Sequence, residues 1–343
     1  MEKNKEYGSD FHYISDQEYR RDSKTDFFGS EVQFYFSGRV ALKVILSESI
    51  KNQSLKKIYV PSYYCHEVYE FIKDLNIIIE YYDCDPIKNE LPNDIKDING
   101  YGLLVVNYFG LSSPSFEGYK NLIIIEDLTH NLELISESKA DYVFGSLRKV
   151  LPVPVGGFVK SKKSLPQLEK SAFAEDVALE KLTGMVLKKK YLDGSFKEKQ
   201  VFRKLFINTE TSFENNQTFA SLPSLIEKYF FELDTKKIIS VKKNNSLLVK
   251  ENLIMNSNFA LLSNSLNTEF ALILKFKSNK QRDELKSYLI SKQIYPMVLW
   301  PNQIYENDIL LEKTILFIHI DFRYSSEDIL HITNTINHFY NGA

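Results

Sequence analysis

The sequence predicts an α/β protein with a large domain, built on a mostly parallel sheet that helices cover, and a small α+β domain after it. Between about residue 38 and residue 160, short runs rich in β-branched and aromatic residues alternate with amphipathic stretches. This alternation is typical of parallel strands joined by crossover helices. Several runs are almost continuously apolar, as expected of strands that are buried on both faces. The chain of 343 residues is long enough for both domains.

The first 160 residues supply the strands and helices of the large domain. The predicted strands are KIYVP (57–61), IIIEYYD (77–83), GLLVVNY (102–108), NLIIIED (121–127), DYVFGS (141–146) and GGFVK (156–160). A helix at 38–46 follows a Ser-Gly pair that suits a helix N-terminus. A second helix is predicted at 65–75, because apolar residues recur there at i, i+3, i+4 and i+7.

The remainder of the chain is predicted to be helical first and mixed afterwards. Residues 165–250 are helical and charged, and their basic portion (181–206) is expected to be a solvated helix face, because acidic residues surround it. The final ninety residues predict strands at 269–278, 294–301 and 314–322 and helices at 279–292 and 325–340, the last capped by Ser325 or Ser326. We therefore expect domains at 1–250 and 251–343.

Composition excludes several classes of function. The 43 basic and 45 acidic residues leave no strong field that would favour nucleic acid or an anionic membrane as a partner. The two cysteines, Cys65 and Cys84, form no spacing typical of a disulfide framework or a zinc site, so no metal is predicted. The N-terminus is polar, and no run approaches the roughly 18 apolar residues of a membrane span. A soluble, cytoplasmic protein is expected.

Chemically useful side chains gather where the predicted strands end, which is where open α/β sheets bind ligands. These strand ends carry residues 63–65, 107–109, 127–130 and 146–149. Singly, each has an ordinary interpretation: Asp127 suits a helix N-cap, His130 a surface position, and the tyrosines a sheet rim. Together, a lysine, a carboxylate, an imidazole, aromatic rings and a helix start match the needs of one cofactor, pyridoxal phosphate.

Pyridoxal phosphate needs a lysine that forms an imine, an acid that keeps the pyridine nitrogen protonated, and hydrogen-bond donors for its phosphate. The lysine must lose its proton to attack an aldehyde, and burial beside a cation such as Arg148 would lower its pKa. Asp127 is the candidate acid. Backbone N–H groups at the start of the helix after Ser37 and Gly38 are candidates for the phosphate.

The sequence resembles a known family in several motifs. These are FYFSGRVAL, IYVPSYYCHEV, LLVVNYFG, IIIEDLTHNL, FGSLRKVLPVPVGG and IHIDFRYSSEDI. They are similar to fold type I pyridoxal phosphate enzymes of the aspartate aminotransferase type, and among these to the DegT/StrS-type sugar aminotransferases. Lys149 stands seven residues before Gly156, which is the family's spacing between its lysine and a Gly-Gly pair. The resemblance implies a seven-stranded sheet in the large domain.

The resemblance also implies roles for individual residues. Lys149 would be the Schiff-base lysine, Asp127 the partner of the pyridinium nitrogen, and His130 a neighbour of the ring oxygen. The other positions implied for the cofactor are Ser37, Gly38, Arg39, Tyr64 and Ser146. Tyr64 could cover one face of the ring, although Tyr63 and Cys65 compete for that place. Departures from the family are Arg39, where many members have Thr, Val155, where an acid is expected, and Ser146, whose offset from the lysine differs.

The resemblance implies an aminotransferase that moves an amino group from an amino acid such as glutamate to a keto-sugar, nucleotide-linked, for amino-sugar or polysaccharide biosynthesis. It further implies a homodimer with shared active sites. No residue is an obvious ligand for the donor's α-carboxylate, and Arg323 is a candidate by position alone. A sugar dehydratase or an amino-acid lyase on the same fold, or a non-catalytic homologue, stays open. An NAD enzyme is disfavoured, since no G-x-G-x-x-G follows the first strand.

Overall fold

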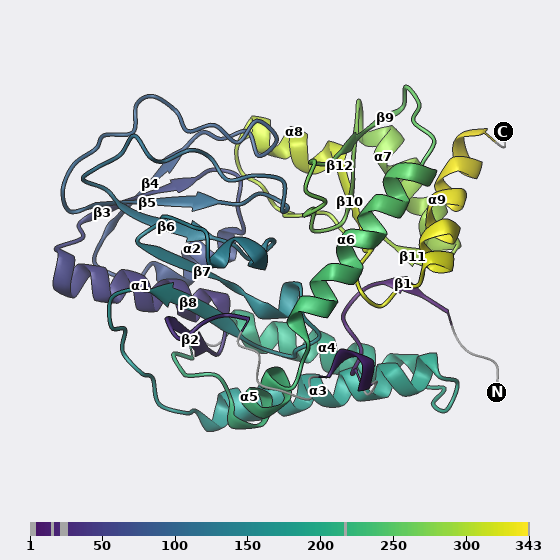
Figure 1. The fold of residues 1–343 in the computed structure, drawn as a ribbon, viewed down its shortest axis with the longest axis horizontal. Helices are drawn as coiled ribbons and strands as arrows, with labels where there is room; N and C mark the ends of the chain where they lie inside the picture. The colour runs from purple at the N-terminus through teal and green to yellow at the C-terminus, as the bar shows by residue number, and fades with distance from the viewer. Residues whose placement is uncertain (1–4, 15–16, 21–26, 216–217, 342–343) are drawn as a thin grey trace. The chain divides into compact units, whose positions relative to one another are not determined.

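A computed structural model gives the structure of residues 5–14, 17–20, 27–215 and 218–341 (Figure 1). Contacts between Cα atoms divide the chain into two compact units. Unit 1 comprises Met1–Lys3, Phe11–Tyr108 and Ser112–Leu233, and unit 2 comprises Asn4–Asp10, Phe109–Leu111 and Asp234–Ala343. The domain boundary that the sequence predicts at residue 250 stays a prediction.

Unit 1 is built on a seven-stranded sheet with the order β2-β8-β7-β6-β5-β3-β4. The strands are β2 (Val32–Tyr35), β3 (Lys57–Pro61), β4 (Ile78–Tyr82), β5 (Tyr101–Val106), β6 (Ile123–Asp127), β7 (Tyr142–Ser146) and β8 (Gly157–Ser161). Strand β8 is antiparallel to both of its neighbours, and the pairs from β7 to β4 are all parallel. The predicted fold class, a mostly parallel α/β sheet with a smaller α+β part, is confirmed.

Six strands of this sheet overlap the six that the sequence predicts. Every residue of β6 is buried, which agrees with its continuous apolar run. The seventh strand, β2, lies at the edge of the sheet and was not predicted as a strand. Only its two end residues are buried, so its sequence carries little of the apolar signal that marks a central strand.

The helices of unit 1 are α1 (Gly38–Gln53), α2 (His66–Ile72), α3 (Ala172–Leu192), α4 (Lys199–Asn215) and α5 (Ser224–Phe231), with short 3-10 helices η1 (Gln17–Tyr19), η2 (Leu132–Ile135) and η3 (Leu147–Lys149). Helix α1 packs against β7 and β8, and α3 lies beside α4 (Figure 1). The predicted start of α1 is confirmed, because Ser37 Oγ accepts a hydrogen bond from the Val40 N–H at 3.3 Å.

Unit 2 contains a three-stranded antiparallel sheet with the order β12-β10-β9 and a two-stranded parallel pair. Its strands are β1 (Tyr7–Gly8), β9 (Phe259–Leu262), β10 (Leu272–Phe276), β11 (Ile294–Tyr295) and β12 (Ile315–Ile318), and its helices are α6 (Thr235–Asn252), α7 (Asn279–Ser291), α8 (Glu306–Thr314) and α9 (Ser326–Asn341). Side chains from α6, α7, α9 and the sheet form its apolar core.

Unit 2 departs from the sequence prediction at several elements. The predicted strand 294–301 is reduced to β11, because Pro296 has no N–H to donate, and only an isolated bridge between Met297 and Phe317 follows. Strands β1 and β9 and helix α8 were not predicted. The cap of α9 is confirmed: Ser325 Oγ accepts from the Asp328 N–H at 3.3 Å, and the Ser325 N–H donates to Asp328 Oδ2 at 3.0 Å.

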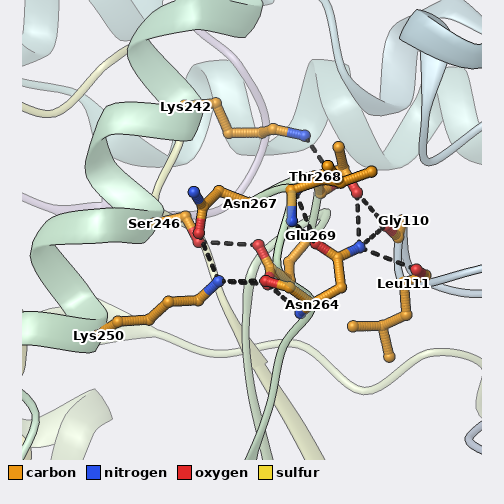
Figure 2. A network of polar contacts seen from close by, with 10 residues as sticks. Gly110, Leu111, Lys242, Ser246, Lys250, Asn264, Asn267, Thr268 and Glu269 are labelled. Atoms are coloured by element: carbon orange, nitrogen blue, oxygen red, sulfur yellow. Dashed lines mark hydrogen bonds and ion pairs between the residues drawn. The ribbon is translucent and has the colours of Figure 1, made fainter.

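A polar network holds the loop before β10 to α6 within unit 2 (Figure 2). The buried Glu269 carboxylate accepts hydrogen bonds from Lys250 Nζ at 2.8 Å and from Ser246 Oγ at 2.8 Å. The Asn264 side chain donates to the carbonyl oxygens of Gly110 at 3.1 Å and Leu111 at 2.8 Å. The network therefore ties α6, the loop and the segment Phe109–Leu111 together. No helix within the described ranges has the length and hydropathy that crossing a membrane requires.

Candidate active site

Glycines allow the start of α1 to lie directly against the ends of β7 and β8. A Cβ atom at Gly157 would stand 2.2 Å from the Ser37 carbonyl carbon and 2.5 Å from the Gly38 nitrogen, which is closer than any side chain tolerates. A Cβ atom at Gly38 would lie 3.1 Å from the Cβ atom of Ser146. Three of the predicted site residues, Ser37, Gly38 and Ser146, are thus brought together by backbone contacts.

The loop after β6 is fastened to the end of β7 through one threonine. The Thr129 N–H donates to Oδ1 of Asp127 at 2.8 Å, and Thr129 Oγ1 accepts from the Ser146 N–H at 3.0 Å. Thr129 was not singled out from the sequence, because its role depends on the neighbouring strand. It connects Asp127 to the start of α1 through Ser146.

Asp127 ends β6 and is 5% exposed. The hydroxyl of Tyr64, which follows β3, donates a hydrogen bond to its Oδ2. Burial raises the pKa of Asp127, while the hydrogen bonds from Thr129 and Tyr64 lower it. Each carboxylate oxygen can accept a second hydrogen bond, so Asp127 can still hold a protonated ring nitrogen.

Tyr64 is itself buried, and burial raises the pKa of its hydroxyl well above the ordinary value. Its role as a cover for the cofactor ring stays a prediction, and its hydroxyl is used to hold Asp127. His130 is also buried, three residues after Asp127. Asn107, at the end of β5, is 1% exposed, and within the described part of the chain its Oδ1 has no hydrogen-bond partner.

Arg39 is the second residue of α1, and Cys65 is the N-cap residue of α2. The Arg39 Nη2 atom is 3.9 Å from Glu67 Oε2, and the arginine side chain is 13% exposed. Burial raises the pKa of the Cys65 thiol, while Lys149 and Arg39 both lower it. Cys65 is therefore close enough to Lys149 to feel its charge.

Lys149 ends η3, and its side chain is exposed to solvent. Its pKa is lowered to about 8, first by the Arg148 cation and second by lost hydration, while the Glu210 carboxylate opposes the shift. Because the lysine is exposed, we attribute the shift mainly to Arg148. The sequence predicts this effect of Arg148, and the amine is consequently much easier to deprotonate than an ordinary lysine.

The charges around Lys149 include two residues that the sequence did not reveal, Glu210 on α4 and Lys181 on α3. Lys181 Nζ donates to Glu210 Oε1, and its side chain is 5% exposed. The expectation that the basic portion 181–206 is a solvated face is wrong at Lys181, because that cation is buried against a carboxylate from the adjacent helix. No local spacing pairs these two residues, which are 29 positions apart.

Arg323 lies in unit 2, where its guanidinium group donates hydrogen bonds to neighbouring residues. Its Nε and Nη2 atoms donate to Asp321 at 2.8 and 2.7 Å, and Nη1 donates to the Ser9 carbonyl oxygen at 3.1 Å. Burial would raise the pKa of Asp321, but the Arg323 charge holds it far below its ordinary value. With a side chain 3% exposed, this guanidinium has a structural role, and we do not carry it forward as a ligand for a donor carboxylate.

The sequence matches no protein-family model and no curated protein. Its fold, however, is similar to solved structures. One is a Streptococcus pneumoniae protein described as a candidate sugar aminotransferase in its PMP form, with TM-score 0.63, 11% identity and 96% of each chain covered. Another is GDP-4-keto-6-deoxy-D-mannose-3-dehydratase of E. coli with bound hydrated PLP, with TM-score 0.61, 14% identity and coverage of 90% of this chain and 88% of that one.

A third is a DegT DnrJ EryC1 StrS aminotransferase from Brucella abortus, with TM-score 0.55, 12% identity and coverage of 94% of this chain and 92% of that one. These likenesses confirm the predicted fold, that of fold type I pyridoxal phosphate enzymes. At identities this low they establish the fold and leave the activity to the residues of the site.

Proposed function

We propose that this chain is a pyridoxal phosphate-dependent aminotransferase that moves an amino group from an amino acid such as glutamate to a nucleotide-linked keto-sugar. The observation that carries the proposal is Lys149, a lysine whose pKa is lowered to about 8 and which stands three residues after β7, the strand next to the one that ends in the buried Asp127. Structures with this fold include proteins described as sugar aminotransferases, which supports the choice of substrate class.

The residues present fit the cofactor. Asp127 is a buried carboxylate with acceptor capacity left, suited to a pyridinium N–H. The first N–H groups of α1 have no carbonyl partner in a preceding turn, and the absence of a Cβ atom at Gly38 lets the start of this helix lie directly against Ser146. Bound there, pyridoxal phosphate would supply an aldehyde for the lysine and an electron sink for charge that develops on the donor's Cα atom.

Each residue then has a defined task. The Nζ atom of Lys149 would hold the cofactor, and as a free amine it would take a proton from the donor's Cα atom. Asp127 holds the proton on the ring nitrogen, and Tyr64 holds Asp127 in place. The start of α1 and Ser146 orient the phosphate.

The test is the visible absorbance of the purified protein with added pyridoxal phosphate, measured before and after glutamate. The proposal expects a visible band that Lys149→Ala lacks and that glutamate bleaches. Absence of the band in the wild-type protein would contradict the proposal. Lys139→Ala serves as the control, because it removes an exposed lysine that pairs with Glu117 and leaves the charges around Lys149 in place.

A sugar dehydratase is the second candidate, and the fold shared with the E. coli dehydratase favours it. It would use the same lysine and aspartate. A band that depends on Lys149 but ignores glutamate and other amino-acid donors would favour this reaction over amino transfer.

A further inference from the structure

Beside Lys149, two cations share one carboxylate. Arg148 Nη1 donates to Glu210 Oε1 at 2.9 Å, and Lys181 Nζ donates to the same oxygen. Lys149 adds a third basic group to this cluster, because the charges of Arg148, Glu210 and Lys181 all act on it. Burial would raise the pKa of Glu210, but Arg148, Lys181 and Lys149 hold it well below its ordinary value. The cluster therefore has an excess of positive charge that an anion would neutralise.

The Arg148 guanidinium is held in place yet has donors to spare. It lies 4.9 Å from the centroid of the Phe213 ring, which stacks on Phe36 at 5.1 Å and 21°. Within the described part of the chain, its only hydrogen bond uses Nη1, so Nε and Nη2 keep their N–H groups for another partner. The Arg148 side chain is 13% exposed and that of Glu210 is 38% exposed, so solvent reaches the cluster.

We propose that Arg148, with Lys181 behind it, forms the subsite for the α-carboxylate of the amino donor. This inference rests on the proposed function, since it assigns a substrate group to the same site. A planar guanidinium with two adjacent N–H groups matches a carboxylate in bidentate geometry. The neighbouring position of Arg148 and Lys149 in the sequence would deliver the donor's Cα atom, one bond from its carboxylate, to the lysine that moves the proton.

A phosphate group is the alternative anion. The start of α1 already offers N–H groups for the cofactor phosphate. The donor carboxylate, unlike the cofactor phosphate, must bind and leave in each turnover. When no donor is bound, the Glu210 carboxylate accepts the hydrogen bond from Arg148 in its place. Glu210 thus acts as an internal competitor for the guanidinium.

The experiment compares wild type, Arg148→Lys and Glu210→Gln, each loaded with pyridoxal phosphate. The probe is glutarate, which has both carboxylates of glutamate and no amine, and its dissociation constant is measured by calorimetry. Arg148→Lys keeps the charge and loses the planar fork, so we expect glutarate to bind about tenfold more weakly. Glu210→Gln removes the competitor, so we expect glutarate to bind more tightly than in wild type.

The two variants are expected to change the affinity for glutarate in opposite directions. Poor folding would instead weaken glutarate binding in both variants, so the comparison separates a binding role from structural damage. Bleaching of the visible band by glutamate should show a raised KM with little change in kcat for Arg148→Lys. Isoglutamine, the α-amide of glutamate, should bleach wild type more slowly than glutamate, and the two should differ less in Arg148→Lys.

Unchanged glutarate binding in both variants would overturn the inference. So would a loss of pyridoxal phosphate affinity, or of inorganic pyrophosphate binding, in Arg148→Lys with glutarate binding intact, because the guanidinium would then serve phosphate groups. A wild-type protein without a visible band would instead refute the proposed function, and the subsite with it.

Discussion

The hydroxyl of Tyr64 donates a hydrogen bond to Oδ2 of Asp127. This bond joins the segment that follows β3 to the last residue of β6. In the sheet, β5 lies between these two strands, so the bond spans the carboxyl edge of the central strands. Both side chains are buried. Because an ionised carboxylate is costly in a buried site, this donor helps to keep Asp127 charged.

Tyr64→Phe is expected to weaken pyridoxal phosphate binding at acidic pH. Removing the hydroxyl removes an influence that lowers the pKa of Asp127, so the pKa rises and the carboxyl stays protonated up to a higher pH. A protonated Asp127 cannot hold the pyridinium. Titration of the visible band from acid to neutral pH checks this, and Tyr69→Phe, which loses a buried hydroxyl bonded to the Pro61 carbonyl oxygen, is the control. The prediction would be contradicted if the visible band of Tyr64→Phe and of wild type were lost over the same range of acidic pH.

The rate at which pyridoxal phosphate binds covalently should rise with pH around the pKa of Lys149, which is about 8. The amine must be unprotonated to attack the aldehyde, and the Arg148 cation disfavours the protonated form. In Arg148→Gln that cation is gone, so the midpoint of the pH profile should move upward. Arg148→Lys keeps the charge and should keep the midpoint. An unshifted midpoint in Arg148→Gln would show that another group sets the pKa.

Much of the fold was predictable because its signals are local. The strand NLIIIED is an apolar run whose burial needs no knowledge of its neighbours, and Ser37 marks the start of α1 by its position before an amphipathic segment. The short edge strand β2 and the pair of β1 with β11 carry no such signal. Each is defined by a partner that is distant in the sequence.

The candidate site divides in the same way. Lys149 and Asp127 could be singled out as candidates, because Asp127 ends a recognisable strand and Lys149 follows another by three residues. Thr129, Glu210 and Lys181 could not, because their roles come from contacts between separate elements. For Arg323, the sequence does not reveal the ion pair with Asp321, which occupies its guanidinium in unit 2.

Gly157→Ala should destabilise the protein and impair cofactor binding. The new Cβ atom would stand 2.2 Å from the Ser37 carbonyl group, so the start of α1 would have to move away from β8. Overpacking of this kind costs about 1–3 kcal/mol of unfolding free energy. Denaturant unfolding measures the loss, and Gly118→Ala, where no atom lies within 4 Å of the new Cβ, is the control. Equal stability of the two variants would contradict the packing described.

Glu269→Leu should lower the unfolding free energy by about 3 kcal/mol, because it leaves Lys250 Nζ and Ser246 without their buried acceptor (Figure 2). Burial would raise the pKa of Glu269, but Lys250 and the other hydrogen bonds keep it lowered. Its contribution is therefore present above the unfolded pKa and lost as pH falls, so wild type and variant should converge in acid. Glu284→Gln, which breaks an exposed pair with Lys280, should change little.

The central claim is that Lys149 is the residue that binds pyridoxal phosphate covalently. The most direct measurement is borohydride reduction of the protein loaded with the cofactor, followed by mass spectrometry of its peptides. The account predicts a single pyridoxyl group on Lys149 in the peptide that contains LRKVLPVPVGG, and none in Lys149→Ala. A pyridoxyl group on Lys181 or another lysine, or no stable modification at all, would contradict it.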